Sequence, residues 1–352
     1  MNTRSNSNRV YGLDILKALC SLGVILIHFP FPGKIGSCLV ALSRVAVPVF
    51  FMITGYFYID TQNQKCELVQ IKKILRLCVF SNILYVLWGL IVEWKGDYTT
   101  FFYEIKDRYS FLEIFLFNGS PISGHLWYLN AILYVLVVVY FLSRVFSKHS
   151  ERILLTLTPF LLLINQIFGN YAPLLLQREY PFVYCRNFLF TGIPYFTLGL
   201  FLRKHKEVVI KFTEKRILFV ALTLFFAVTT ILEWYLLGYF DFFALVPHYI
   251  STTFLSVLVF SVFMRHDWDG KLMLLQTIGR KYATDIYIIH LMVNRGVVKM
   301  IYRLPIHEYY TLISPIVVFL VSILFSMLFA NAYAFLESKY SKWLAAKVGS
   351  RQ

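Results

Sequence analysis

Long apolar segments that recur along the chain constrain its fold more than any other feature. About 20 mostly apolar residues are enough to cross a bilayer as an α-helix. Only 15% of the residues are charged, against about 25% in typical soluble domains. We therefore expect an all-α, polytopic membrane protein in which the 352 residues form one domain, with its core at about residues 10–335. Ten such segments are found, at residues 12–30, 38–59, 75–94, 125–146, 152–170, 186–203, 215–238, 243–264, 282–302 and 310–335.

The basic residues between these segments indicate the orientation of the chain, because Lys and Arg favour cytoplasmic loops. With the N-terminus in the cytoplasm, the cytoplasmic segments hold 23 of the 34 basic residues and the outer segments hold 7. This asymmetry predicts a bundle of about ten transmembrane helices in the cell membrane with both termini cytoplasmic. Asp14 and Lys17 interrupt the apolar part of the first segment, so we expect it to be retained rather than cleaved as a signal peptide.

The net charge and the cysteines exclude two other classes of function. The charge of +15 does not indicate nucleic-acid binding, because the basic residues lie in short clusters between apolar stretches. The five cysteines form neither a CxxC pair nor a Cys/His pattern with metal-ligand spacing. Neither a disulfide framework nor a metal site is therefore predicted, and the sequence leaves the oligomeric state open.

The first segment, YGLDILKALCSLGVILIH, carries three ionisable side chains. One residue turns about 100° around a helix, so Asp14, Lys17, Ser21 and His28 fall within about 60° of one another. Asp14 and His28 lie about 21 Å apart along the axis. Ionisable groups in lipid are costly and usually face a bundle interior or a wet cavity. The stripe therefore predicts one wall of a site that crosses most of the membrane. The alternative is that Asp14 and Lys17 reach one membrane surface and His28 lies at the other.

Other segments carry polar side chains at the same two levels of the membrane. The outer level holds Arg44, His125, Trp127, Arg186 and His290. The inner level holds Lys17, Lys72, Lys73, Arg76, Arg280 and Lys281. Anchoring at the interface, a satisfied core histidine and ordinary topology signals are the alternative interpretations of most of these residues. Arg44 fits these alternatives least, because an Arg two turns into an apolar span needs a partner or water.

These residue types suit the transfer of an acyl group. A near-neutral imidazole can take the proton of a hydroxyl that attacks an acyl carbon. A nearby Arg can stabilise the developing oxyanion or hold an anionic group. A cluster of Lys and Arg suits the phosphates of a nucleotide-like donor. The pattern predicts transfer from a cytoplasmic donor to an acceptor at the outer side.

Several segments resemble the integral-membrane acyltransferase 3 family. Ten residues separate Lys17 from His28, as in the (Arg/Lys)-x10-His motif of that family. The segment SRVAVPVFFMITGYF resembles its second span, with Thr54-Gly55-Tyr56 where the family often has Ser-Gly-Tyr. HLWYL, GIPYFTLG and DIYIIH resemble later segments, so the resemblance covers about residues 10–335.

The resemblance implies a ten-helix bundle that takes acetyl-coenzyme A as acyl donor and O-acetylates a cell-surface polysaccharide or its lipid-linked precursor. It makes His28 catalytic with Lys17 as its basic partner, and Asp14 joins this set through the shared stripe. The outer-level residues are predicted to bind the acceptor glycan, and membrane lipid is the other expected partner. The Arg-x-Arg pair of the family is absent, so Lys73 and Arg76 are predicted to bind the donor.

Two functions of other classes remain as alternatives. An exporter or flippase of a glycan or lipid-linked intermediate would have the same general fold. The sequence shows neither a Walker motif nor a clear inverted repeat, which counts against a pump-like transporter. A non-catalytic membrane scaffold would leave the shared polar face of the first segment unexplained.

Overall fold

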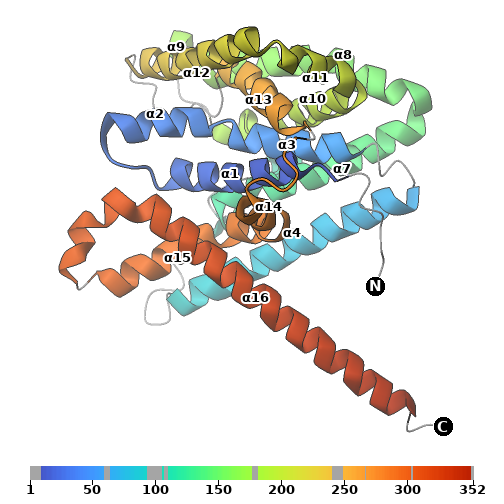
Figure 1. Ribbon diagram of the computed structural model, residues 1–352, viewed down its shortest axis with the longest axis vertical. Coiled ribbons are helices and arrows are strands. Elements are labelled where there is room, and N and C mark those ends of the chain that lie inside the picture. Colours follow the sequence, from blue (N-terminus) through green and yellow to red (C-terminus); the bar gives the residue numbers. More distant parts are fainter. Residues whose placement is uncertain are drawn as a thin grey trace.

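Helices make up the secondary structure throughout the described part of the chain, as expected for an all-α fold. The computed structural model describes residues 9–58, 64–92, 105–106, 110–176, 181–239, 249–265, 267–302 and 304–349, and contains no strand among them. In Figure 1, α1 (Tyr11–His28) lies in the middle of the bundle. Helices α8 and α12 lie on one side of it, and α4 and α16 lie on the other.

Among the described residues, seven helical segments are long and apolar enough to cross a membrane. Some combine two consecutive elements, such as α2 (Gly33–Ser43) with α3 (Ala46–Tyr58). The other named elements of this group are α4 (Gln64–Val92), α7 (Trp127–Val145), α8 (Ser150–Gln166), α12 (Arg216–Tyr239) and α16 (Tyr310–Gly349). The segments themselves are Tyr11–His28, Gly33–Tyr58, Cys66–Val92, Gly124–Val145, Ser150–Tyr171, Arg216–Tyr239 and Tyr310–Ala330.

The other three predicted spans are also helical but fall short of these criteria. Helix α10 (Ile193–Lys204) has 12 residues and follows a π-helical turn at Phe188–Gly192. Helix α13 (Ile250–Phe263) has 14 residues, and residues 243–248 of that predicted span lie outside the described residues. Helix α15 (Ala283–Ile301) is long enough but carries Asp285, Arg295 and Lys299. The count of ten and the cytoplasmic termini therefore stay predictions.

Two helices extend well past the predicted spans. Helix α4 begins at Gln64 rather than near residue 75, and α16 continues to Gly349 rather than ending near residue 335. Hydropathy marks only the apolar part of a helix, whereas Lys and Arg are themselves good helix formers. The charged turns that flank these spans therefore continue the helices. The remaining short helices are α6 (Phe111–Leu116), α9 (Ala172–Leu176), α11 (Lys206–Glu214) and α14 (Met273–Lys281).

The second predicted span, residues 38–59, starts earlier and is broken rather than continuous. Helix α2 ends at Ser43, and the N–H groups of Arg44 and Val45 bond to carbonyls three residues back, at 3.3 and 3.4 Å. Pro48 explains the break, because its ring clashes with the carbonyl four residues earlier, that of Arg44, and it has no N–H to donate. Arg44 is thereby set at a turn inside the bundle instead of along a regular helix.

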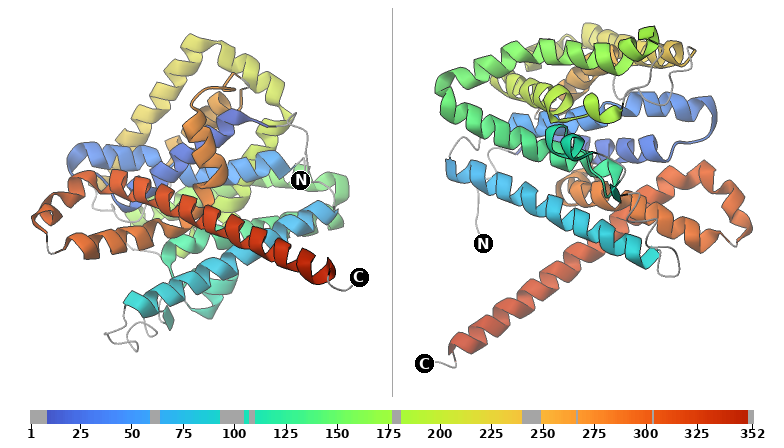
Figure 2. Two further views of the ribbon diagram at one scale, coloured as in Figure 1. Left: turned by 60° about the horizontal axis from the view of Figure 1, so that its bottom comes forward. Right: turned by 180° about the vertical axis from the view of Figure 1, so that it is seen from behind.

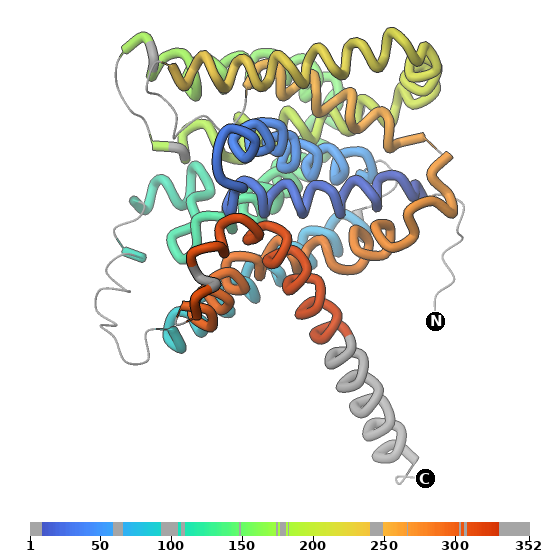
Figure 3. The backbone as a smooth tube through the Cα atoms, turned by 60° about the vertical axis from the view of Figure 1, so that its left-hand side comes forward, coloured from blue at the N-terminus to red at the C-terminus, as the bar shows by residue number. Residues whose placement is uncertain are grey.

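Within the described part of the chain, helix α1 packs against at least six other helices, on several sides of the bundle (Figure 3). Its N-terminal end meets α14 at Gly279, whose Cα lies so near the Asp14 backbone carbonyl that no Cβ fits between them. Helix α15 and the first part of α16 pack side by side as an antiparallel pair, with the 3₁₀ turn Pro305–Tyr309 between them (Figure 2). Both α15 and α16 also contact α1.

Helices α3 and α10 cross with their backbones in close approach. Gly55 of α3 faces the Phe196 carbonyl, and Gly199 of α10 faces the Met52 carbonyl. A Cβ at either glycine would overlap backbone atoms of the other helix. Small residues at such crossings allow membrane helices to pack tightly. This crossing fixes α3, which carries one side of the cavity described below.

Replacing Gly199 by Ala is expected to destabilise the bundle, because the added methyl meets a backbone carbonyl that has no room to move. Overpacking of this kind costs about 1–3 kcal/mol. Gly296→Ala is the matched control, because its Cβ would have no neighbour nearer than Trp88 at 3.9 Å. The thermal midpoint in detergent, followed by fluorescence size-exclusion chromatography, should fall for Gly199→Ala and hold or rise for Gly296→Ala. Equal midpoints would refute the close crossing.

Candidate active site

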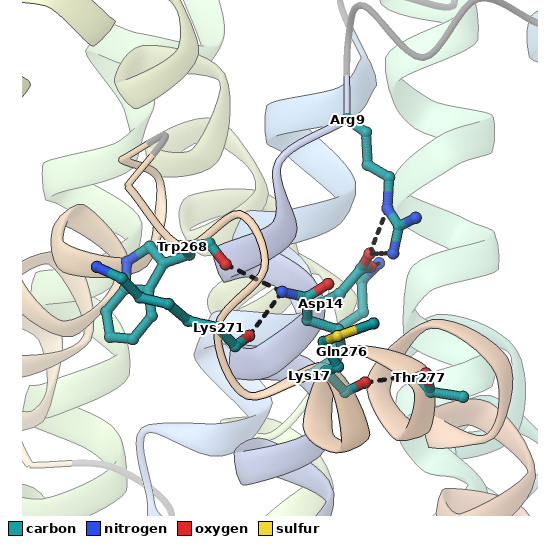
Figure 4. Close-up of polar contacts among 8 residues, drawn as sticks. Arg9, Asp14, Lys17, Trp268, Lys271, Gln276 and Thr277 are labelled. Carbon is teal, nitrogen blue, oxygen red and sulfur yellow. Dashed lines mark hydrogen bonds and ion pairs between the residues drawn. The ribbon is translucent and has the colours of Figure 1, made fainter.

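A buried carboxylate organises the first turn of α1. Asp14 is only 7% exposed and accepts hydrogen bonds from Arg9 Nε at 3.2 Å and Lys17 Nζ at 3.1 Å (Figure 4). Burying a charge is costly unless it is paired, and these two cations pair it. An acidic residue in the first turn also complements the helix dipole. Asp14 therefore holds Lys17 in place, while Ser21 bonds to the Lys17 carbonyl at 2.9 Å.

Lys17 lines a cavity of about 290 Å³, which we call the basic cavity. Lys73 of α4 and Arg280 of α14 also line it, together with Thr54 of α3. Arg280 reaches this place because Gly279, the preceding residue, lets α14 approach α1. No acidic side chain is found among the described residues that line the basic cavity. The basic cavity therefore presents three cations and suits an anionic group.

Only one of the two residues predicted to bind the donor lines the basic cavity. Lys73 lines the basic cavity, whereas Arg76, three residues later on α4, does not and is exposed. Arg280, which the sequence places at the inner level without assigning it a role, occupies the cavity instead. The donor-binding role of Lys73 and Arg76 stays a prediction.

Three histidines from distant parts of the chain meet at the other end of α1. We call His28, His125 and His290 the histidine cluster. The ring centre of His290 lies 5.1 Å from those of both His28 and His125, and the His28 and His125 centres are 6.4 Å apart. His28 is the last residue of α1, His125 lies just before α7, and His290 is on α15. The fold thus brings together three of the predicted site residues.

The hydrogen bonds of the two buried histidines determine which nitrogen carries the proton. His125 Nε2 lies 3.2 Å from the Ile288 carbonyl, which only accepts, so Nε2 is protonated and Ser123 Oγ donates to Nδ1 at 2.9 Å. His290 Nδ1 lies 2.8 Å from the Tyr287 carbonyl and is protonated for the same reason. Both ring nitrogens of His125 have hydrogen-bond partners, whereas among the described residues only Nδ1 of His290 has one.

His28 and Arg44 line a second and larger cavity, of about 1130 Å³, which we call the Arg44 cavity. The His28 side chain is exposed in it, in contrast to His125 and His290. The Nε atom of Arg44 is buried and has no hydrogen-bond partner among the described residues. The rest of the lining includes Trp234, Tyr249, Asn294 and Tyr310. The Arg44 cavity therefore combines aromatic faces with an accessible imidazole and an incompletely bonded guanidinium group.

Arg186 and Trp127 form a pair beside the histidine cluster. The Arg186 guanidinium lies over the Trp127 ring, 5.2 Å from its centre, and Trp127 is buried. Neither residue lines the basic cavity or the Arg44 cavity. Their predicted role in acceptor binding stays a prediction.

Tyr287 lies between the basic cavity and the histidine cluster, and sequence reasoning did not select it. Its side chain lines the basic cavity, its hydroxyl donates to the His125 backbone carbonyl, and its ring centre is 5.7 Å from that of His125. In the segment DIYIIH it precedes His290 by three residues, and such residues share a helix face. That spacing of three residues was the sequence signal that could have identified Tyr287. The described residues contain no group of three or more His, Cys, Asp or Glu that could hold a metal ion.

Comparison with known proteins gives one distant relative and one family. Over 143 residues the chain is 27% identical to an amino-acid racemase of Enterococcus faecalis, a match that covers 39% of this chain and 20% of that protein. The chain thus spans about a fifth of the length of that relative. No solved structure matches. The family model of the acyltransferase 3 domain matches residues 10–334, almost all of the helical bundle, and the chain therefore belongs to the acyltransferase 3 family.

Proposed function

We propose that this protein is an O-acetyltransferase of the cell membrane. It would transfer an acetyl group from cytoplasmic acetyl-coenzyme A to a hydroxyl of a cell-surface polysaccharide or its lipid-linked precursor. Membership of an acyltransferase family supports the reaction class. The observation that carries the finer proposal is that α1 joins a basic cavity at its Lys17 end to an accessible histidine at its other end. The racemase matches over only a fifth of its length, so its activity is not assigned to this chain.

The basic cavity is the proposed site for the phosphates of the donor. Lys17, Lys73 and Arg280 supply three cations from three different helices. Hydrogen bonds between charged groups are the strong ones in proteins, and they suit phosphate oxygens. Since coenzyme A is cytoplasmic, this assignment puts the Lys17 end of α1 at the cytoplasmic face, in agreement with the distribution of basic residues along the chain.

The acyl group has to travel along α1 to reach His28. Lys17 and His28 are eleven residues apart, which corresponds to about 16 Å along the helix axis. An extended thioester arm bound by its phosphates at the basic cavity would point along this path. Tyr287 stands on the path, between the basic cavity and the histidine cluster. We therefore expect the Tyr287 side chain to move when the thioester passes.

The Arg44 cavity is the proposed acceptor site. Its volume of about 1130 Å³ slightly exceeds the range of about 300–1,000 Å³ that is typical of ligand pockets. Trp234, Tyr249 and Tyr310 offer faces against which sugar rings can pack. Arg44 has hydrogen-bonding capacity left for a polar or anionic group of the acceptor or of the reacting centre. The position of His28 in the wall puts its imidazole within reach of an acceptor hydroxyl.

The reaction needs one proton transfer in each direction. The acceptor oxygen bonds to the acyl carbon while its proton passes to His28, which acts as general base. The Arg44 guanidinium stabilises the negative charge that develops on the acyl oxygen. The carbon–sulfur bond then breaks, and the leaving thiolate takes the proton from His28. His28 returns to its neutral form, ready for the next cycle.

Substitution of His28 by Ala is expected to lower O-acetylation at least about 100-fold, since a positioned general base contributes 10²–10⁴ in rate. His149→Ala is the matched control, because His149 is exposed and lies outside the site. Mass spectrometry of the surface glycan measures ester-linked acetate, and immunoblotting measures the amount of protein. Normal acetylation in the His28→Ala strain would exclude this function.

The exporter alternative makes a different prediction for deletion of the gene. Unmodified polymer would accumulate inside the cell, and membranes that contain the protein would not consume acetyl-coenzyme A. Mass spectrometry of secreted and intracellular glycan distinguishes the two functions. The acetyltransferase predicts that the polymer is still secreted but lacks its acetyl groups.

Removal of a cation from the basic cavity is expected to weaken donor binding. Lys73→Ala should raise KM for acetyl-coenzyme A about tenfold or more with a smaller effect on kcat, because a hydrogen bond to a charged group contributes about 1.5–3 kcal/mol. Lys72→Ala, on the same helix but outside the cavity, should leave KM nearly unchanged. Radiolabelled acetyl-coenzyme A supplied to inside-out vesicles gives both constants. Equal effects of the two substitutions would rule out the basic cavity as the phosphate site.

A further inference from the structure

One nitrogen in the histidine cluster is buried without a hydrogen-bond partner. His290 is 0% exposed, and its Nδ1 is held by the Tyr287 carbonyl at 2.8 Å. Its Nε2 has no partner among the described residues. Since Nδ1 carries the proton, Nε2 presents a bare lone pair. A buried acceptor left without a donor costs free energy, so such a group calls for an explanation.

His28 is the neighbouring imidazole for which no hydrogen bond is found among the described residues. The two ring centres are 5.1 Å apart, with the rings tilted by 43°. Two imidazoles joined by an N–H···N bond of about 2.9 Å have ring centres about 5 Å apart, because each nitrogen lies about 1.1 Å from its ring centre. The separation fits such a hydrogen bond once the two ring nitrogens face each other.

His125 does not compete for this role. Its two nitrogens are bonded to Ser123 and to the Ile288 carbonyl. Its ring centre is also farther from His28, at 6.4 Å. Its hydrogen bond to the Ile288 carbonyl ties the start of α7 to α15 two residues before His290. His125 therefore holds the cluster together, and His290 is the member with a free acceptor.

We propose that His290 is a positioning residue for His28. Its Nε2 accepts a hydrogen bond from one ring N–H of His28, so that the lone pair of the other His28 nitrogen points into the Arg44 cavity. The same bond stabilises the imidazolium that forms when His28 takes the acceptor proton. A third group that orients the base is a general feature of activated hydroxyl attack. The inference rests on the proposed function, in which His28 is the base.

The proton balance of the reaction is unchanged by this role. His290 keeps its proton on Nδ1 and neither gains nor loses one during the cycle. The proton from the acceptor hydroxyl stays on His28 until the leaving thiolate takes it. This assignment differs from the acceptor-binding role that the sequence predicts for His290, because the residue is buried and lines neither of the two cavities.

Two amide substitutions separate a positioning role from a purely structural one. In His290→Gln the amide oxygen takes the place of Nε2 and can accept a bond from His28. In His290→Asn the amide nitrogen takes the place of Nδ1 and can keep the bond to the Tyr287 carbonyl, but no acceptor faces His28. We expect His290→Gln to retain at least about a tenth of kcat, and His290→Asn to lose about 100-fold in kcat with little change in KM for either substrate.

Measurements of kcat and KM on the full-length protein in membranes distinguish failure of the positioning role from failure of the proposed function. Higher activity in His290→Asn than in His290→Gln, or equal loss in both, would overturn the positioning role while leaving His28 as the base. Full activity of His28→Ala in the same assay would overturn the proposed function itself. Protein amount and thermal midpoint are measured for every variant.

If a His290 variant fails to fold, the unaltered protein provides a second measurement. Histidine labelled with ¹⁵N allows the coupling across an N–H···N bond to be detected in the protein reconstituted in lipid bilayers. A coupling between a His28 nitrogen and His290 Nε2 is expected. Its absence, with both ring signals assigned, would overturn the proposal.

Discussion

Lipid supplies no hydrogen-bond partners, so each ionisable group inside the bundle needs a partner in the protein or a wet cavity. Helix α1 contains ionisable groups of both kinds. At one end, buried Asp14 is paired with Arg9 and Lys17. At the other end, His28 is exposed in a cavity that it shares with Arg44. The central place of α1 among the other helices follows from this need, because a lipid-facing α1 would leave these groups unsatisfied.

Close packing and polar ties around α1 hold the two cavities in place. Gly279 lets α14 bring its basic end against α1 and so completes the basic cavity. Buried Glu67 accepts hydrogen bonds from Tyr58 at 2.7 Å and Arg144 at 2.6 Å, which ties together α3, α4 and α7. Glu233 of α12 accepts a hydrogen bond from the first backbone N–H of α13, at 2.8 Å. These contacts fix the walls of the two cavities. Tyr287 lies between the basic cavity and the histidine cluster.

The sequence was informative about single helices and much less so about how they meet. The apolar segments predicted the helices. The polar stripe was interpreted as one wall of a single site, whereas Lys17 and His28 line two separate cavities. The break at Arg44 was missed, although Pro48 marks it. The convergence of His28 with two histidines about 100 and 260 residues away along the chain was not predictable, because no local pattern encodes a contact between distant helices. The same reason hid the position of Tyr287 between the basic cavity and the histidine cluster.

In the proposed arrangement, α1 joins sites on opposite sides of the membrane, and solvent accessibility tests this arrangement most directly. Single cysteines at Lys73, in the basic cavity, and at Ser37, in the Arg44 cavity, can be placed in a background in which Cys38 and Cys66 are replaced by Ser. A membrane-impermeant maleimide is then applied to inside-out and right-side-out vesicles. We expect Lys73→Cys to react only from the cytoplasmic side and Ser37→Cys only from the outer side. Reaction of both cysteines from the same side would contradict the account.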